Sequence, residues 1–369
     1  MRGANEIDFW RGLALVSIFI NHIPGFTFER LTYRNLGLSD SAELFVFLAG
    51  WSLRRLVDGA TEPVGLGRLI LRLGARAVTL YAAQMLITVA ALGLIAAAAL
   101  GLGNPLLLDW NNAGAVFSDP VQAHIGLVLL THQLGFFDIL PLYVTLMLGS
   151  PALAIVHRIA PGLVLPLALL IYAVALGFGI NLPTWPMEGT WYFNPFAWQL
   201  VFVLGFALAG DVGLGARVRR HQRALRVLGA VLLVAALIVV RADWAPDPLL
   251  VPQPRLFFIF DKSFVTPARL LHFLALVVVF AGTFRLIHRH AKAVARFGSM
   301  LGRNSLNVFC VGSLLSLVGQ IARFAYGHVR VTDAVILVVG IVGLGLTAWL
   351  SELRERLRGH GGSGSPRPA

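Results

Sequence analysis

The chain is a succession of long apolar runs separated by short polar, Pro-rich or Gly-rich segments. A helix needs about 20 mostly apolar residues to cross the ~30 Å hydrocarbon core of a bilayer, because each residue adds about 1.5 Å. The pattern therefore predicts an all-α, polytopic membrane protein with about ten transmembrane helices. The predicted spans are residues 8–26, 41–57, 78–102, 138–157, 162–180, 195–212, 226–241, 266–287, 304–322 and 331–350.

Composition agrees with this pattern over nearly the whole length. Of the 369 residues, 57% are hydrophobic and only 13% are charged, and the mean hydropathy is +0.77. A soluble domain carries about 25% charged residues. We therefore predict a single transmembrane domain over residues 1–350, followed by a basic, flexible cytoplasmic tail over residues 351–369.

Basic residues orient the predicted helices. The formal net charge is +12, which would favour nucleic-acid binding in a soluble protein, but here Lys and Arg lie between apolar runs. With ten spans, 22 of the 30 Lys and Arg residues fall at one set of helix ends and 8 at the other. Because basic residues accumulate at cytoplasmic ends, both termini are predicted to be cytoplasmic. Membrane lipid, and not nucleic acid, is the expected surrounding partner.

Residues 121–137 are apolar but short, and they contain His124 and His132. If this segment crossed the membrane, every later helix would reverse and the Lys and Arg residues would divide 13 to 17. That division would remove the charge bias, so we predict an interfacial or re-entrant helix on the non-cytoplasmic side.

The sequence offers no motif for a bound metal or cofactor. Cys310 is the single cysteine of the chain, which excludes an internal disulfide and a cysteine metal cluster. A metalloprotease-type HExxH motif and a nucleophile-elbow serine are also absent from the sequence. We expect neither a metal nor a resident cofactor.

The first predicted helix carries ionisable residues, which are costly inside a membrane and therefore mark a candidate functional site. Arg11 and His22 are eleven residues apart, which on a helix is about three turns plus 20°, so they share a face at ~16.5 Å separation. Asp8 precedes Arg11 by three residues and can pair with it. A snorkelling arginine and an interfacial histidine bonded to a backbone carbonyl explain the same residues without function. Gly12 predicts a closely packed neighbouring helix.

Further polar residues lie at the predicted non-cytoplasmic ends, at the depth of His22. Glu43, at the start of the second span, is placed to orient the imidazole of His22 or to bind a hydroxyl. Alternatively, it caps its own helix together with Ser39 or Asp40. We interpret the set as a polar chamber whose members are candidate substrate-binding residues. Besides Glu43, these are Asp138, Asn194, Lys262, Arg269 and His272.

Three arginines precede the third span on the predicted cytoplasmic side. Arg68, Arg72 and Arg76 are spaced four apart, which places them on one helical stripe. Such a stripe is either a topology signal beside anionic lipid or a site for a multiply phosphorylated ligand, because guanidinium groups bind phosphate through two parallel hydrogen bonds.

Several segments together resemble one family. The first two, EIDFWRGLALVSIFINHIPG and SDSAELFVFLAGW, resemble the OpgC family, whose members succinylate osmoregulated periplasmic glucans, and the wider acyltransferase-3 superfamily of membrane acyltransferases. The spacing of Arg11 and His22 matches the arginine–histidine motif of that superfamily. Later segments follow in the same order, so that the resemblance covers roughly residues 5–350; they are DILPLYVTLML, WYFNPFAWQLVFVLG, DKSFVTPARLLHF and LGRNSLNVF.

The resemblance implies a ten-helix inner-membrane acyltransferase that moves an acyl group from cytoplasmic acyl-CoA, a cosubstrate expected to be succinyl-CoA, to a glycan hydroxyl outside. It gives His22 the catalytic role and Arg11 a supporting one. It also assigns Arg68, Arg72 and Arg76 to CoA binding, although three residues separate Arg72 from Arg76 where the superfamily pattern has two. By residue type alone, a transporter or flippase that moves a glycan or lipid-linked substrate without covalent chemistry remains the alternative, since polar groups in a bundle also suit a substrate path.

Overall fold

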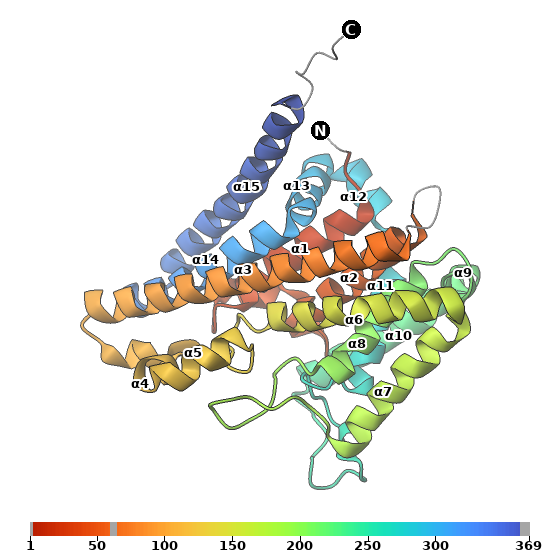
Figure 1. Ribbon diagram of the computed structural model, residues 1–369, viewed down its shortest axis with the longest axis horizontal. Coiled ribbons are helices and arrows are strands. Elements are labelled where there is room, and N and C mark those ends of the chain that lie inside the picture. The colour runs from red at the N-terminus through yellow and green to blue at the C-terminus, as the bar shows by residue number, and fades with distance from the viewer. Residues whose placement is uncertain (1–2, 60–64, 362–369) are drawn as a thin grey trace. The chain divides into compact units, whose positions relative to one another are not determined.

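A computed structural model describes residues 3–59 and 65–361. Their regular structure is helical, and their single β-bridge joins Pro183 to Thr190. This confirms the predicted all-α class. The α-helices of Figure 1 are α1 (Glu6–Asn21), α2 (Ser41–Asp58), α3 (Leu66–Gly101), α4 (Gly114–Ser118), α5 (Pro120–Val128), α6 (Ile139–Ile159), α7 (Val164–Phe178), α8 (Pro195–Leu208), α9 (Leu214–Arg220), α10 (Gln222–Arg241), α11 (Pro267–Phe280), α12 (Phe284–His290), α13 (Lys292–Arg303), α14 (Ser305–Tyr326) and α15 (Arg330–Gly361).

Six of the described helical segments are long and apolar enough to cross a membrane by themselves. They are α3, α6, α7 with its short 3-10 entry, α10, α14 and α15, and a seventh span results if α11 and α12 count as one broken span. Two helices within predicted spans, α1 and α8, have only 16 and 14 residues. The count of about ten spans and the cytoplasmic placement of the termini stay predictions.

The apolar surface of these helices supports a membrane environment. In the most apolar window of α10 only 11% of the residues are buried inside the protein, and in that of α15 only 22%. Large apolar side chains on both helices are therefore exposed, among them Val231, Ile238, Val338 and Leu346. Soluble proteins rarely leave such continuous apolar faces uncovered, whereas lipid tails cover them without cost.

The segment over residues 121–137 forms the nine-residue helix α5 followed by turns. Nine residues extend only ~13.5 Å, about half of a hydrocarbon core. This length agrees with the prediction that the segment does not cross the membrane. At the other end of the chain, α15 continues through Gly361, so the first part of the predicted flexible tail is helical, and residues 362–369 lie outside the described residues.

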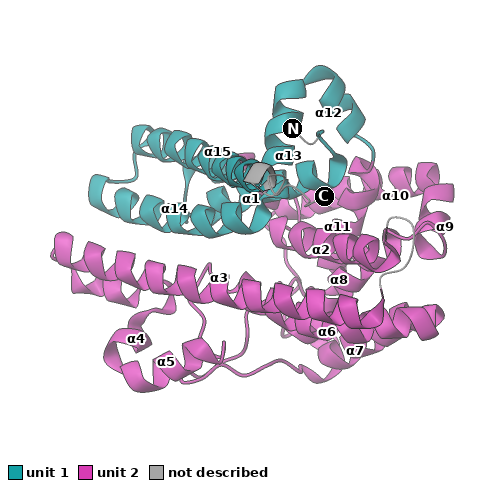
Figure 2. Cartoon of the chain, turned by 45° about the horizontal axis from the view of Figure 1, so that its top comes forward, with its two compact units in different colours: residues 1–29, 282–369 teal, residues 30–281 magenta. Residues whose placement is uncertain are grey.

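The chain divides into two compact units, coloured separately in Figure 2. Unit 1 comprises residues 1–29 and 282–369, and within it α1 packs on α13 and α14, and α14 packs on α15. Unit 2 comprises residues 30–281, where α2 and α7 pack on α8, α3 on α6, and α10 on α11.

Glycines allow the closest helix contacts in each unit. A Cβ atom added to Gly12 would lie well under 3.0 Å from the Gly298 carbonyl of α13, and one added to Gly302 would collide with the Asp8 carbonyl. In unit 2 the same relation joins Gly50 to the Phe202 carbonyl. These contacts confirm the predicted close packing at Gly12, and they fix α1 on α13 and α2 on α8.

Candidate active site

His22 is the C-cap residue of α1. The helix starts at the cap Asn5, whose side chain accepts a hydrogen bond from the Asp8 N–H at 2.9 Å. It ends where the His22 N–H donates to the Ile18 carbonyl at 2.9 Å. His22 is half-buried, and Leu15 and Ile18, on the same stripe, are buried. The histidine thus lies where the regular helix stops and the chain becomes irregular.

Arg11 lies near the start of α1 and is also half-buried. Its Nη1 atom is 3.4 Å from Oδ1 of Asp8, and both side chains are less than a fifth exposed. The predicted pairing of Asp8 with Arg11 is therefore confirmed. The shared helix separates Arg11 from His22 by about three turns, so the two residues do not act on the same atoms.

Three side chains of α14 donate hydrogen bonds to backbone carbonyls at the end of α1. Ser316 Oγ donates to the Phe19 carbonyl at 2.9 Å, and Gln320 Nε2 donates to the His22 carbonyl at 2.6 Å. Arg323 then donates to the carbonyls of Pro24 and, at 2.7 Å, Gly25. We call Ser316, Gln320 and Arg323 the α14 ladder; their spacing of four and three residues places them on one helix face.

The last member of the ladder is held by α15. Arg323 Nε lies 2.9 Å from Oδ1 of Asp333, with side chains 7% and 1% exposed. Asp333 Oδ2 in turn accepts hydrogen bonds from the Thr27 N–H at 2.8 Å and its hydroxyl at 2.5 Å. The segment that follows His22 is therefore fixed to both α14 and α15.

Sequence reasoning missed Gln320, Arg323 and Asp333, because each lies at the end of a predicted span, where polar residues are ordinary. The signal that could have identified them is the polar stripe formed by Ser316, Gln320 and Arg323 on an otherwise apolar helix. Their partners are almost 300 residues away in the chain, which no local pattern reveals.

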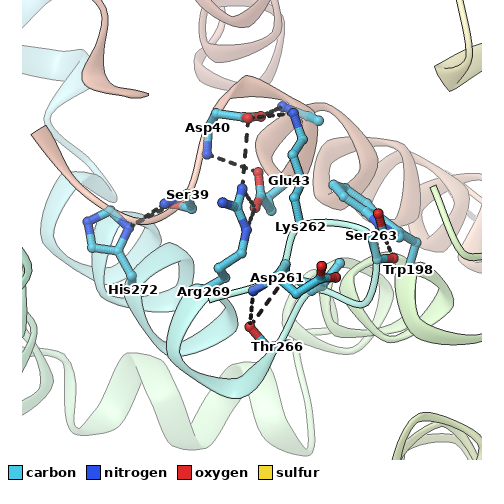
Figure 3. A network of polar contacts seen from close by, with 12 residues as sticks. Ser39, Asp40, Glu43, Trp198, Asp261, Lys262, Ser263, Thr266, Arg269 and His272 are labelled. Carbon is cyan, nitrogen blue, oxygen red and sulfur yellow. Dashed lines mark hydrogen bonds and ion pairs between the residues drawn. The ribbon is translucent and has the colours of Figure 1, made fainter. Parts of the chain in front are cut away.

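In unit 2, four of the predicted and neighbouring residues form a charge cluster (Figure 3). Lys262 Nζ lies 2.5 Å from Oδ2 of Asp40, and Arg269 Nη2 lies 2.6 Å from Oε1 of Glu43. Arg269 also reaches Asp40 at 3.8 Å. Two cations thus face two carboxylates, and the Glu43 side chain is fully buried. We call Asp40, Glu43, Lys262 and Arg269 the charge cluster.

The start of α2 explains the position of the two carboxylates. Asp40 is the N-cap and accepts a hydrogen bond from the Ala42 N–H at 2.9 Å, while Glu43 Oε2 accepts one from the Asp40 N–H at 3.0 Å. This capping box confirms the alternative interpretation of Glu43 as helix-start chemistry. Burial raises the pKa of Asp40, but the charges of Lys262 and Arg269 outweigh burial and hold this pKa well below its usual range. Burial in turn lowers the pKa of Lys262, but Asp40, Tyr192 and Glu43 together outweigh burial and raise this pKa.

His272 joins α11 to the residue before the cap. Its Nδ1 atom accepts a hydrogen bond from the Ser39 N–H at 3.2 Å and lies 2.7 Å from the Ser39 hydroxyl. An N–H can only donate, so Nδ1 carries a lone pair and the hydroxyl donates to it as well. Both residues are at most 5% exposed. Through these contacts His272 holds the chain segment before α2 in place, and they give no support to its predicted substrate-binding role.

Asn194 and Asp138 differ in what their side chains contact. The fully buried Asn194 caps α8, because Oδ1 accepts from the Phe196 N–H at 3.0 Å and Nδ2 donates to the Ile180 carbonyl at 2.8 Å. Its contacts are structural and do not support substrate binding. Asp138 occupies the N-cap position of α6 without a capping hydrogen bond. Burial raises the pKa of Asp138 to about 6, and the charge of Lys262 opposes that rise.

The predicted role of Glu43 in orienting His22 stays a prediction. Its two oxygens are used by Arg269 and by the Asp40 N–H, and these contacts lie within unit 2, whereas His22 and Arg11 belong to unit 1. Within unit 2, the structure thus brings together Glu43, Lys262 and Arg269. Among residues 3–59 and 65–361, no group of three or more His, Cys, Asp and Glu side chains is placed to hold a metal ion.

Arg68, Arg72 and Arg76 lie on the first three turns of α3, as the spacing predicts. All three are exposed, whereas the residues that follow each of the first two, Leu69 and Leu73, are buried. The arginine stripe is therefore accessible to a ligand outside the protein. A nucleotide phosphate and an anionic lipid headgroup both have the charge that such a stripe binds.

Comparison with protein families agrees with the resemblance found in the sequence. A family model described as OpgC protein matches residues 4–356, which includes α1 with His22, the charge cluster, the arginine stripe and the α14 ladder. No curated protein and no solved structure matches the chain. With nearly its whole length matched to that model, the chain belongs to the OpgC family.

Proposed function

We propose that the protein is an inner-membrane O-acyltransferase that moves an acyl group, succinyl in our proposal, from cytoplasmic acyl-CoA to a hydroxyl of a periplasmic glucan. Membership of the OpgC family points to glucan modification by acyl transfer. The observation that carries the proposal for this chain is the position of His22 at the end of the apolar helix α1, half-buried beside irregular backbone. An imidazole in such a place is the residue type best suited to move a proton near neutral pH.

In the proposed reaction, neutral His22 removes the proton of a glucan hydroxyl as the hydroxyl oxygen attacks the thioester carbon. The carbon–sulfur bond breaks, the new ester bond forms, and the proton passes from His22 to the leaving CoA thiolate. An acyl-histidine intermediate is the alternative route and gives the same products. Arg11, some three turns away on α1, supports the reaction by placing positive charge along the path of the donor.

The CoA phosphates are proposed to bind at Arg68, Arg72 and Arg76. Support comes from the exposure of all three side chains and their common stripe at the start of α3. Guanidinium groups bind phosphate oxygens through paired hydrogen bonds, and three in series suit a ligand with several phosphates. The predicted cytoplasmic position of this end of α3 agrees with a cytoplasmic donor.

The charge cluster is proposed to receive the free carboxylate of the succinyl group. Its two cations already face two carboxylates, so a substrate carboxylate must share a cation with Asp40 rather than find an unpaired one. Lys262 suits this better than Arg269, because its side chain is 25% exposed and that of Arg269 is 13% exposed. Asp138, whose raised pKa is partly lowered by the charge of Lys262, is proposed as a further residue of this substrate site.

The test uses the full chain purified into lipid vesicles, with isotope-labelled succinyl-CoA and unsubstituted periplasmic glucan. Mass spectrometry of the glucan and release of free CoA are measured together. The proposal predicts one succinyl ester per CoA released, and loss of both signals in His22→Ala. A vesicle that moves glucan across the membrane without covalent change would instead establish the transporter function and contradict the proposal.

A further inference from the structure

The end of α1 needs partners from elsewhere in the chain, because the last carbonyls of a helix lack intrahelical donors. Here the Ile23 N–H bonds the Ile20 carbonyl at 3.3 Å, which leaves the Phe19 carbonyl without its regular helical partner. The Ser316 hydroxyl donates to that carbonyl. The next residues of the same ladder bond the carbonyls of His22, Pro24 and Gly25.

The ladder therefore fixes the backbone at His22 itself and on both sides of it. Its three residues follow one face of α14 at positions i, i+4 and i+7. Later residues of the ladder bond carbonyls later in the chain, from Phe19 to Gly25. Gly319, also on α14, approaches Ile23 so closely that an added Cβ would lie 2.9 Å from its side chain. The contact is thus continuous along the helix face.

The buried ion pair gives the ladder a rigid end. A carboxylate and a guanidinium almost excluded from solvent are costly to bury, and further hydrogen bonds beside the ion pair help to offset that cost. Arg323 and Asp333 have such bonds, and each of them leads back to the segment that follows His22, at Pro24, Gly25 and Thr27. A pair that served only to join α14 to α15 would not need these contacts.

We infer that Gln320, Arg323 and Asp333 are positioning residues for the acyl-transfer reaction, which hold the His22 backbone so that the imidazole faces the reacting hydroxyl and thioester. The inference rests on the proposed function, in which His22 transfers the proton. Displacement of a catalytic group by about 1 Å can lower a rate by about two orders of magnitude. Loss of the ladder should therefore lower kcat and leave the KM for acyl-CoA unchanged.

The test compares variants of the ladder with matched variants of another contact in the same unit. Removing one member of the buried pair would leave an unpaired charge and threaten folding, so the double variant Arg323→Met/Asp333→Leu is used, with Gln320→Met as the mildest change. The matched double variant is Arg303→Met/Glu352→Leu, which removes the 2.7 Å ion pair between α13 and α15. Asn307→Leu is matched to Gln320→Met, because Asn307 bonds Ser351 from the same helix.

Succinyl transfer from labelled succinyl-CoA to periplasmic glucan is measured on full-length protein in vesicles, at equal folded content. Gln320→Met should lower kcat at least fivefold and the ladder double variant at least tenfold, with KM within twofold. Gln320→Glu, which cannot donate from its deprotonated carboxylate to the His22 carbonyl, should behave like Gln320→Met. The matched variants should stay within twofold of the parent.

A second readout does not depend on turnover. Diethyl pyrocarbonate modifies neutral imidazoles, and mass spectrometry gives its rate at each histidine as a function of pH. The ladder variants should change the rate or its pH profile at His22 at least threefold and leave the exposed His124 unchanged. Equal kcat losses in ladder and matched variants, with an unchanged His22 profile, would overturn the inference.

His22→Gln separates this inference from the proposed function. If His22→Gln retains transfer, the proposed catalytic role fails whatever the ladder does. If His22→Gln abolishes transfer while the ladder variants behave like their matched controls, the positioning role alone fails.

Discussion

The end of α1 and the start of α2 are both fixed by buried polar groups, but by different kinds of contact. Around His22, the α14 ladder donates to backbone carbonyls. Around His272, the imidazole itself is the acceptor, with its Nδ1 bonded to the Ser39 N–H and close to the Ser39 hydroxyl. The bonds around His22 fix that residue through its main chain. The bonds around His272 use a ring nitrogen to hold the chain before α2 in place.

This difference separates two histidines that sequence reasoning treated as members of one polar chamber. A general base must accept a proton from its substrate through a ring nitrogen. His272 uses that capacity within the protein and is 5% exposed, so its contacts are those of a structural residue. The ladder bonds reach the carbonyl of His22 and not its ring, and the proposed function gives proton transfer to His22.

The largest expected effect concerns the charge cluster, where side chains bond side chains. Glu43→Leu should lower stability by about 3–5 kcal/mol, because the buried Arg269 then keeps only its 3.8 Å ion pair with Asp40. Glu43→Leu/Arg269→Met should recover most of that loss. Thermal unfolding in detergent, followed by intrinsic fluorescence, measures both. A double variant no more stable than the single one would show that the cluster does not act as a balanced set.

Replacement of a glycine at a close helix contact should lower stability by an intermediate amount, and by a similar amount in unit 1 and in unit 2. Gly12→Ala and Gly50→Ala each place a Cβ against a carbonyl of the neighbouring helix, and overpacking of this kind costs about 1–3 kcal/mol. Gly93→Ala on α3 is the control, because nothing lies within 4 Å of its added Cβ, and alanine is there the better helix former. Comparable unfolding temperatures for all three variants would contradict the close packing of α1 on α13 and α2 on α8.

The arginine stripe contrasts with both regions because its cations are exposed. The triple variant Arg68→Gln/Arg72→Gln/Arg76→Gln should raise the KM for acyl-CoA about tenfold at unchanged kcat, since several phosphate contacts of the charged type are lost. Added salt should raise the KM of the parent protein in the same direction. Initial rates against acyl-CoA concentration measure this.

The control for the stripe is Arg220→Gln/Arg223→Gln, which removes two exposed arginines elsewhere in unit 2. It should change KM less than twofold. An unchanged KM in the triple variant would assign the stripe to membrane topology and lipid contact instead of CoA binding.

The smallest effect is expected at Asp138, the N-cap residue of α6. Burial raises the pKa of Asp138 to about 6, so the folded protein holds the proton more tightly than the unfolded chain does. Relative to Asp138→Asn, the parent protein should therefore be at its most stable below about pH 4 and lose stability as the pH rises through 6. Unfolding temperatures at pH 4.5, 6 and 7.5 measure the trend, and the exposed Asp243→Asn should show none. A difference that does not vary with pH would contradict the raised pKa.

Local features of the fold and site were predictable from sequence. Apolar runs located α2 and α6 to within two residues at each end, because burial in lipid or protein selects such runs. The i,i+3 pair of Asp8 with Arg11 and the capping box at Asp40 also depend only on neighbouring residues. Helix α3 extends to Leu66, before the predicted span, since arginine and leucine are good helix formers outside a membrane as well.

Contacts between distant segments were not predictable. The run at 266–287 reads as one span, yet the backbone breaks at Ala281 and Gly282, where Gly282 has φ +80°. Hydropathy does not register such a break. Likewise Arg269 was expected near the substrate, but its partner Glu43 lies 226 residues earlier, and the Arg323–Asp333 pair was not singled out at all. A single sequence shows which side chains are polar but not which of them meet.

The most direct test of the assignment is the rate of succinyl transfer by His22→Gln and His272→Gln, measured side by side at equal folded content. Loss of a general base lowers turnover by about 10²–10⁴-fold, so we predict at least a 100-fold loss of kcat in His22→Gln. For His272→Gln we predict a lower unfolding temperature and a kcat within tenfold of the parent protein. Parent-level turnover in His22→Gln, or the larger loss in His272→Gln, would contradict the assignment.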